Sequence, residues 1–113
     1  MTYLDEFSVD HWDEEKDGVL NQSNIEQKLT KKYGHRCNFV PVVEKGTYLP
    51  DHTHEMTKAD AVLKGELELT IVDGTTKERK PFVLKDGDIL YLPANTIHSA
   101  RAITECAFYD SFV

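Results

Sequence analysis

The sequence has little of several features that mark whole classes of protein. It holds only two cysteines, Cys37 and Cys106, which lie far apart and outside any CxxC motif. We interpret them as buried free thiols in a reducing compartment, with a disulfide between them as the alternative. Apolar runs span only a few residues, and acidic side chains are frequent over residues 1–20. The sequence therefore predicts a cytosolic protein with no membrane span and no secretory or transit peptide.

Positive charge is also scarce. The 13 Lys and Arg residues stand against 20 Asp and Glu residues, which gives a formal net charge of −7. No basic cluster could neutralise a row of phosphates, so we expect no nucleic-acid partner. The sequence also lacks the GxSxG, P-loop, GxGxxG and paired Cys/His motifs, which argues against hydrolase, kinase, dinucleotide-binding and zinc-finger functions.

What the sequence does have is the balance of one small globular domain. Hydrophobic residues make up 40% and charged residues 29% of its 113 positions. Residues 1–22 are polar, without a sustained apolar period, and predict an irregular arm with a short strand at 3–7. Trp12 is a lone large aromatic in this arm, and we expect it to dock on its own domain or on a second subunit.

One short helix is predicted over residues 24–33. The Ser23-x-x-Glu26 pattern is that of a capping box, and Gly34 can supply the left-handed residue that ends the helix. We assign residues 1–35 to an N-terminal arm and helix that pack on the rest of the chain.

From Cys37 onward, β-branched and aromatic runs separated by Gly, Pro and Asp predict short strands. We expect strands at 39–43, 60–63, 66–72, 82–84, 89–92, 98–103 and 106–112. Lys64-Gly65 is interpreted as the tight turn of a hairpin. Such strands are typical of a small antiparallel sandwich or barrel, so the prediction is an all-β fold with a single barrel domain over 36–113.

Three of the five histidines have the spacing of metal ligands. His52 and His54 lie one residue apart, which places both imidazoles on the same side of an extended chain. His98 lies on a later strand, after a turn that contains proline. Three neutral imidazoles suit Fe, Zn, Mn, Ni or Cu and leave positions for water or substrate. The HxH triplet alone is weak, because two surface histidines near a turn give the same pattern. His11 and His35 are predicted to be surface residues.

The spacing around these histidines resembles the two signature motifs of the cupin superfamily. Gly46, His52, His54 and Gly65 match the first motif, and Gly87, Pro93 and His98 match the second. The resemblance implies a double-stranded β-helix, or jelly-roll barrel, which is often dimeric. It also implies one divalent transition metal bound by His52, His54 and His98 at the barrel centre. A homodimer is therefore expected.

Three positions depart from these motifs. Lys58 stands where the family has a metal-binding Glu, and a protonated lysine cannot bind a cation. Asn95 replaces a Gly, which is tolerable because Asn also adopts a left-handed backbone. Ala102 replaces the terminal Asn of the second motif.

Lys58 and Asp60 are the predicted catalytic residues. In a regular strand they share the face of the histidines, and a buried ammonium needs a partner such as Asp60. On this interpretation Lys58 holds an anionic substrate such as a carboxylate, or shuttles a proton with a lowered pKa. In a second interpretation Lys58 bends into solvent and Asp60 is structural. In a third, a shifted strand register makes Asp60 a metal ligand.

Two classes of function remain open. The first is a metalloenzyme with dioxygenase, isomerase or lyase chemistry on a small substrate, and the resemblance extends to three-histidine dioxygenases that lack the carboxylate ligand. The second is a non-catalytic module that binds or senses a small ligand, with or without metal. Four further side chains are expected in the cavity or the core, namely Tyr48, Met56, Tyr91 and Phe108, whereas Glu55 is expected to be exposed.

Overall fold

In the computed structural model, residues 2–33 and 36–113 are described. The helical elements are η1 (Tyr3–Glu6), α1 (Glu14–Asp17) and α2 (Gln22–Tyr33). The strands are β1 (Val9–Asp10), β2 (Phe39–Val43), β3 (Tyr48–His52), β4 (Lys58–Lys64), β5 (Leu67–Val72), β6 (Arg79–Leu84), β7 (Ile89–Leu92), β8 (Ile97–Ala102) and β9 (Cys106–Phe112).

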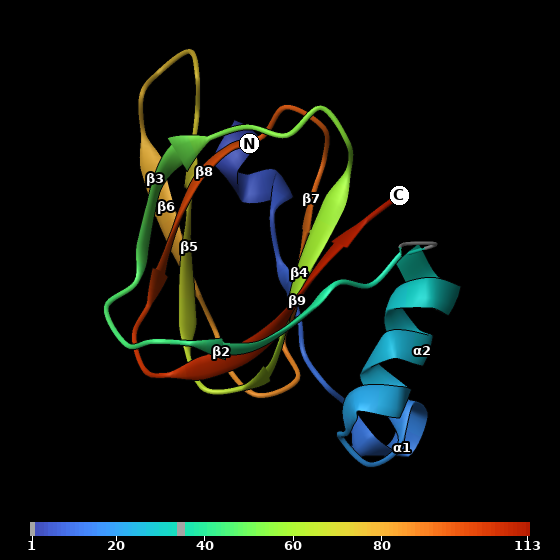
Figure 1. Cartoon of the computed structure of the whole chain (residues 1–113). Coiled ribbons are helices and arrows are strands. Elements are labelled where there is room, and N and C mark those ends of the chain that lie inside the picture. Colours follow the sequence, from blue (N-terminus) through green and yellow to red (C-terminus); the bar gives the residue numbers. More distant parts are fainter. Residues whose placement is uncertain (1, 34–35) are drawn as a thin grey trace.

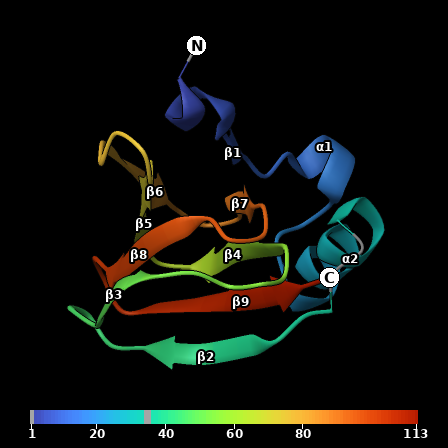
Figure 2. The same ribbon diagram turned by 90° about the horizontal axis from the view of Figure 1, so that it is seen from above.

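The strands form two antiparallel sheets that face each other (Figures 1 and 2). One has the order β1-β7-β4-β9-β2 and the other the order β3-β8-β5-β6. Val62 and Leu90 from the first sheet pack against Leu69, Ile71 and Leu84 from the second, and these side chains form the main core. The fold is therefore mostly β, as the sequence predicts.

Helix α2 covers the outer face of the five-stranded sheet (Figure 1). Ile25 and Leu29 are fully buried there against Ala59 and Ala61 of β4, whose small side chains allow the helix to approach closely. The helix begins at Gln22, two residues before the predicted start, because Asn21 Oδ1 accepts a hydrogen bond from the Asn24 backbone N–H at 2.8 Å. The predicted helix end at Gly34 lies outside the described residues.

The N-terminal arm is more ordered than the sequence predicts. Residues 3–6 form a 3-10 helix rather than a strand, because Asp5 Oδ2 accepts hydrogen bonds from the Thr2 backbone N–H at 3.1 Å and from the Thr2 hydroxyl at 3.2 Å, which caps the first turn. Leu4 and Phe7, three residues apart, are both buried in the main core. The strand of the arm is β1 instead, which pairs with β7.

The predicted hairpin at Lys64-Gly65 is wrong. β4 and β5 lie in different sheets, and the chain passes from one sheet to the other at this turn. Gly65 has a φ of +103°, and a Cβ on it would lie 2.5 Å from the carbonyl oxygen of Glu105. At Lys64-Gly65 the chain thus passes close to the segment at Glu105, and the strands on either side of the turn do not pair with each other.

Trp12 docks on its own chain, one of the two alternatives that the sequence leaves open. Its indole N–H donates to the Gly18 carbonyl at 2.9 Å, and Lys28 Nζ lies 5.1 Å from the ring centroid. The Trp12 side chain also packs on Gly87, where a Cβ would come within 2.4 Å of Trp12 Cβ. This contact fixes the arm against the start of β7.

Both cysteines are free thiols, Cys106 buried and Cys37 partly so. This agrees with the free-thiol interpretation rather than with the disulfide alternative, and burial raises the pKa of each thiol. Among the described residues, no helix has the length and apolar character needed to cross a membrane.

Candidate metal centre

The three histidines come from two neighbouring segments of the four-stranded sheet. His52 ends β3 and faces His98 of β8 across the strand pair. His54 follows in the next loop, where its carbonyl accepts a hydrogen bond from the Asn95 backbone N–H at 2.8 Å. That bond joins the two turns that carry the ligands, and Asn95 itself adopts the expected left-handed backbone with a φ of +66°.

The imidazole rings converge. Their centroids lie 4.3 Å apart for His52 and His98, 4.9 Å for His52 and His54, and 5.4 Å for His54 and His98. One nitrogen from each ring lies within 4.8 Å of the others, so the cluster could hold a metal ion. Asp60 is not part of this group, so the geometry does not favour the interpretation in which Asp60 is a ligand.

The protonation of these rings fits metal binding. Nδ1 of His52 donates to the Pro50 carbonyl at 2.7 Å, and Nδ1 of His98 donates to the Thr96 carbonyl at 2.9 Å. A carbonyl only accepts, so in the neutral ring each Nε2 keeps its lone pair. His54 Nε2 is buried and has no hydrogen-bond partner within the described part of the chain.

Burial also keeps two of these rings uncharged. It lowers the pKa of His98 to about 4, and burial together with nearby Lys58 lowers the pKa of His54. Neutral imidazole is the form that binds metals such as Zn and Fe. His54 and His98 are therefore in the form that binds an ion near neutral pH.

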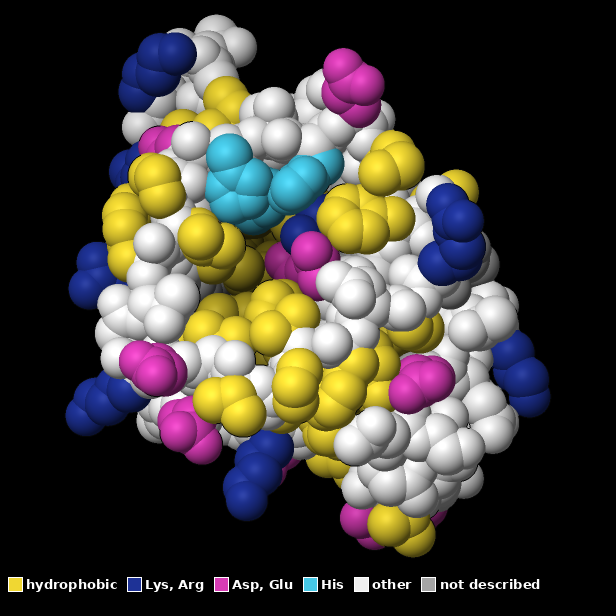
Figure 3. Space-filling view, in the orientation of Figure 1, with side chains coloured by type: hydrophobic (Ala, Val, Ile, Leu, Met, Phe, Trp, Pro, Cys, Tyr) yellow, Lys and Arg dark blue, Asp and Glu magenta, His cyan; other side chains and the backbone are white. Residues whose placement is uncertain are grey.

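The cluster lies at one end of a cavity of about 300 Å³ between the two sheets. Figure 3 shows this hollow with the cyan histidines above it, hydrophobic side chains to its left and below, and acidic and basic side chains to its right. The apolar lining consists of Val40, Val43, Leu49, Leu67, Leu69, Ala100, Ala102 and Phe108. Such a concave, mostly apolar site with a few converging polar groups is typical of small-molecule binding.

Lys58 also lines this cavity and does not bend into solvent. Its side chain is buried, with a relative exposure of 5% for the residue, and its Nζ lies 3.1 Å from Asp60 Oδ1 and 2.5 Å from Asp110 Oδ1. Burial lowers the pKa of Lys58, but Asp60 and Asp110 raise it further, so the net shift is upward. The lowered pKa that the sequence suggests is therefore wrong for this arrangement, and the ammonium stays charged.

Asp110 is a cavity residue that the sequence did not predict. In β9 it lies directly opposite Asp60 of β4, and it lines the same cavity. The available signal was its parity, since Asp110 shares a strand face with the hydrophobic Phe108.

Burial is the main cause that raises the pKa of Asp60 to about 6, while Lys58 opposes that rise.

An ion pair that the sequence did not predict lies beside His52. Asp51, its neighbour in β3, forms two contacts with Arg79, at 2.7 Å to Nη1 and 3.0 Å to Nη2. This bidentate geometry lowers the pKa of Asp51 and ties the end of β3 to the start of β6. The ion pair thereby restricts the segment that carries His52.

The side chains proposed for the cavity or core divide into two groups. Phe108 lines the cavity, whereas Tyr48, Met56 and Tyr91 are exposed and the prediction for them is wrong. Tyr91 points out of β7 because its neighbours in that strand are the ones that face inward, and Met56 lies in a bend outside the strands. Glu55 is exposed, as predicted.

His11 lies at the surface, as predicted, and its Nδ1 is 2.7 Å from Asp88 Oδ1. His35 lies outside the described residues.

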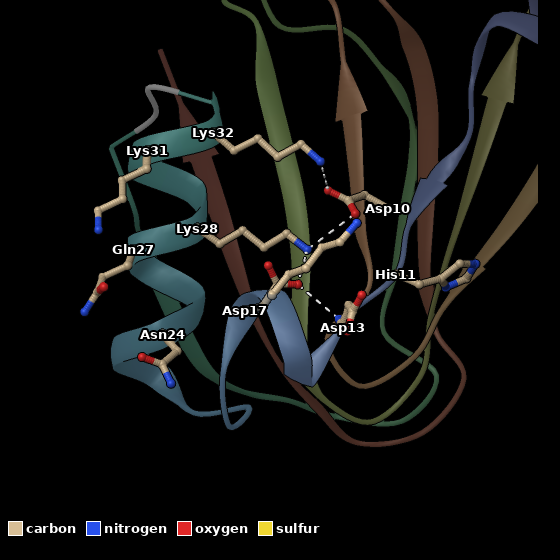
Figure 4. A pocket seen from close by; sticks show the side chains of 10 residues that line it. Asp10, His11, Asp13, Asp17, Asn24, Gln27, Lys28, Lys31 and Lys32 are labelled. Atoms are coloured by element: carbon tan, nitrogen blue, oxygen red, sulfur yellow. Dashed lines mark hydrogen bonds and ion pairs between the residues drawn. The ribbon is translucent and has the colours of Figure 1, made fainter.

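A second hollow lies between α2 and residues 10–17, and its lining is strongly charged (Figure 4). Lys28 Nζ lies 2.8 Å from Asp17 Oδ2, and Lys32 Nζ lies 2.8 Å from Asp10 Oδ2. In these pairs the opposite charges compensate each other, and the pairs join the N-terminal arm to α2. The charged lining of the hollow therefore has a structural role.

The strand order and the positions of the histidines agree with one known family. The family model described as "Cupin domain" matches residues 39–112. The chain belongs to the cupin family. The part of this cupin that is matched contains the three histidines, Lys58 and both carboxylates of the cavity.

Solved structures with the same fold include a cupin superfamily protein from Desulfitobacterium hafniense, with 14% identity and a TM-score of 0.56 over 69% of this chain and 77% of the other. A recombinant oxalate oxidase in complex with glycolate has 23% identity and a TM-score of 0.61, over 94% of this chain and 50% of the other. A salicylate 1,2-dioxygenase from Pseudaminobacter salicylatoxidans has 18% identity and a TM-score of 0.56, over 69% and 20%.

At these identities the matches show the fold alone. This cupin spans half or less of the chains of the two enzymes. No curated protein sequence matches it.

Proposed function

We propose that this cupin binds one divalent transition metal through His52, His54 and His98 and holds a small-molecule substrate in the adjoining cavity. The observation that supports this most directly is the convergence of three imidazole nitrogens at the end of an apolar cavity. Fe, Zn, Mn, Ni and Cu all accept three imidazoles. Such an ion would supply Lewis-acid or oxygen-activating chemistry, as in an oxygenase, isomerase or lyase.

Lys58 and Asp60 are the proposed catalytic residues. Both line the cavity, and the two carboxylates beside Lys58 keep its ammonium charged. Asp60, with a pKa of about 6, is the group that can take up or release a proton near neutral pH. Lys58 positions the carboxylates, and Asp60 exchanges a proton with a bound substrate.

A binding or sensing module is the second candidate. The observation in its favour is that Lys58 occupies the place of the family's metal-binding Glu, so the site offers three ligands rather than four. Two of the similar solved structures are named as an oxidase and a dioxygenase, which supports the catalytic candidate. Oxygen uptake with small thiols, diketones and carboxylates would distinguish the two candidates.

Metal analysis tests the proposal. Protein purified without a His tag is expected to contain close to one transition-metal ion per chain, measured by inductively coupled plasma mass spectrometry. His52→Ala and His98→Ala should lose most of that metal. His11→Ala is the matched control, since His11 is exposed and outside the cluster, and it should keep the metal. Metal-free parent protein, or equal loss in the control, would contradict the proposal.

We also propose a domain arrangement, an oligomeric state and a location for this cupin. Residues 36–113 form one barrel domain on which 1–35 pack, which the burial of Ile25 and Leu29 against β4 supports. The protein is a homodimer, as the family resemblance implies. It is located in the cytosol, which its two free thiols support.

A further inference from the structure

The polar end of the cavity carries an uneven set of charges. Lys58 contributes one cation, and Asp60 and Asp110 contribute two carboxylates, which the β4/β9 register sets directly opposite each other. With both acids ionised the group has a net charge of −1. The charge of Lys58 is therefore already compensated and is poorly available to an anionic ligand.

Two oxygens of this group are also without a hydrogen bond. Asp60 has a relative exposure of 3%, and its Oδ1 finds no hydrogen-bond donor among the described residues. Asp110 Oδ1 is buried in the same way. Lys58 Nζ lies 3.1 Å from Asp60 Oδ1 and 2.5 Å from Asp110 Oδ1, so the contact that each oxygen has is the ion pair with this one ammonium. A buried acceptor in this situation gains free energy from any donor that reaches it.

The rest of the cavity is apolar and small. A volume of about 300 Å³ lies at the lower end of the range for small-molecule sites, so the ligand is small. Its body must match the hydrophobic side chains that line both sheets, among them Val43, Leu69 and Phe108.

We propose that the cavity takes a small, mainly apolar molecule whose head group donates hydrogen bonds, namely a hydroxyl, a thiol or an amine, to Asp60 and Asp110. Carboxylates of the same size are poor ligands, because the carboxylates of Asp60 and Asp110 repel them and Lys58 is already paired. This inference rests on the proposed function, in which the same cavity holds a small molecule, and it names the chemical class of that molecule.

A matched set of probes tests it. 1-Hexanol, hexylamine and hexanoate share one body and differ in the head group. Their affinities at pH 7.5 are measured by isothermal titration, and methyl NMR shifts of cavity side chains show where they bind. We expect the alcohol and the amine to bind at least about tenfold more tightly than hexanoate. Tighter binding of hexanoate, or no binding of any probe, would overturn the proposal.

The same titrations on chelator-treated protein separate this inference from the proposed function. The preference for donor head groups should persist without metal, because it depends on the carboxylates alone. A preference that vanishes on chelation would show that the ion selects the head group and would overturn the inference. The metal content of the parent protein, measured separately, decides the proposed function.

Asp110→Asn removes one carboxylate charge while keeping the side-chain size. It should weaken hexylamine binding about tenfold and raise the relative affinity of hexanoate. Glu68→Gln is the control, because Glu68 lies on the opposite face of β5 from the cavity-lining Leu67 and Leu69. Equal hexylamine affinities in parent and Asp110→Asn protein would contradict the role of the carboxylate pair, and thermal melts establish that each variant is folded.

Discussion

Asp60 and Asp110 face each other because the β4/β9 register places them opposite, and like charges at such a position repel. Lys58 lies between them and offsets this repulsion. Removing either carboxylate or the lysine therefore changes the charge balance of the whole group. At the scale of single residues, the cavity is governed by this group of three.

The raised pKa of Asp60 gives a pH dependence with a defined sign. Its pKa is about 6 in the folded protein against an ordinary value of 3.8. Between these values the folded protein keeps a proton that the unfolded chain releases, so the stabilisation is present at low pH and is lost as the pH rises through 6. The free energy of unfolding of the parent, relative to that of Asp60→Asn, should fall by about 2 kcal/mol between about pH 4 and pH 7.

Urea unfolding of parent and variant across this pH range is the measurement. The titration of His98 affects both proteins and cancels in the difference. Glu68→Gln should show no such slope relative to the parent. A flat difference for Asp60→Asn would show that Asp60 is ionised throughout the range in the folded protein.

Single residues were predicted unevenly from the sequence. The three histidines were found because their spacing is local within each motif, and they lie together in the fold. Asp110 was not found, because its place opposite Asp60 depends on how β9 pairs with β4, which no local pattern records. The sequence left open whether Lys58 is buried or exposed. Asp110 explains why it is buried, because it gives the ammonium a second carboxylate partner.

At the scale of elements, most strands follow from the β-branched runs, but their partners do not. The sequence places a turn at Lys64-Gly65, and a turn exists there, yet β4 pairs with β7 and β9 rather than with β5. A local turn signal fixes where a strand ends and not which sheet receives the next one. The N-terminal 3-10 helix was also missed, and the burial of its Leu4 depends on distant strands that no local pattern records.

Substitution of two glycines distinguishes the free-energy cost of a strained backbone from the cost of steric crowding by an added Cβ. Gly65 and Gly46 both have a positive φ, of +103° and +87°, but only Gly65 has neighbours within 4 Å of a Cβ. Gly46→Ala should lower the free energy of unfolding by about 1 kcal/mol and Gly65→Ala by about 3 kcal/mol. Urea denaturation measures both. Equal losses would show that the crossing at Gly65 adjusts without cost.

At the scale of the whole molecule, the N-terminal arm is part of the folded unit. β1 extends the five-stranded sheet beside β7, Phe7 lies against Phe82 with ring centroids 6.4 Å apart, and Trp12 packs on Gly87. The sequence predicted an arm but could not show that it completes a sheet. The Trp12 contacts within the chain leave the expected homodimer to other surfaces.

Trp12→Ala tests this arrangement. Because the indole packs on its own chain, the variant should unfold about 2 kcal/mol more easily while its mass in solution stays equal to that of the parent. Light scattering after gel filtration measures the mass, and a homodimer gives twice 12.9 kDa. Val19→Ala, at an exposed position, is the control. Conversion of a dimeric parent to a monomer by Trp12→Ala would place Trp12 in the interface instead.

The order of strands in the five-stranded sheet has a consequence for synthesis of the chain. Among the described strands β9 comes last in chain order, yet it lies between β4 and β2 and pairs with both. A nascent chain that ends before residue 106 lacks this partner for β2, and with it the wall formed by Val40 and Val43. Most of the fold consists of such distant pairings, which form slowly. The cavity is therefore complete only after residues 106–112 have been synthesised.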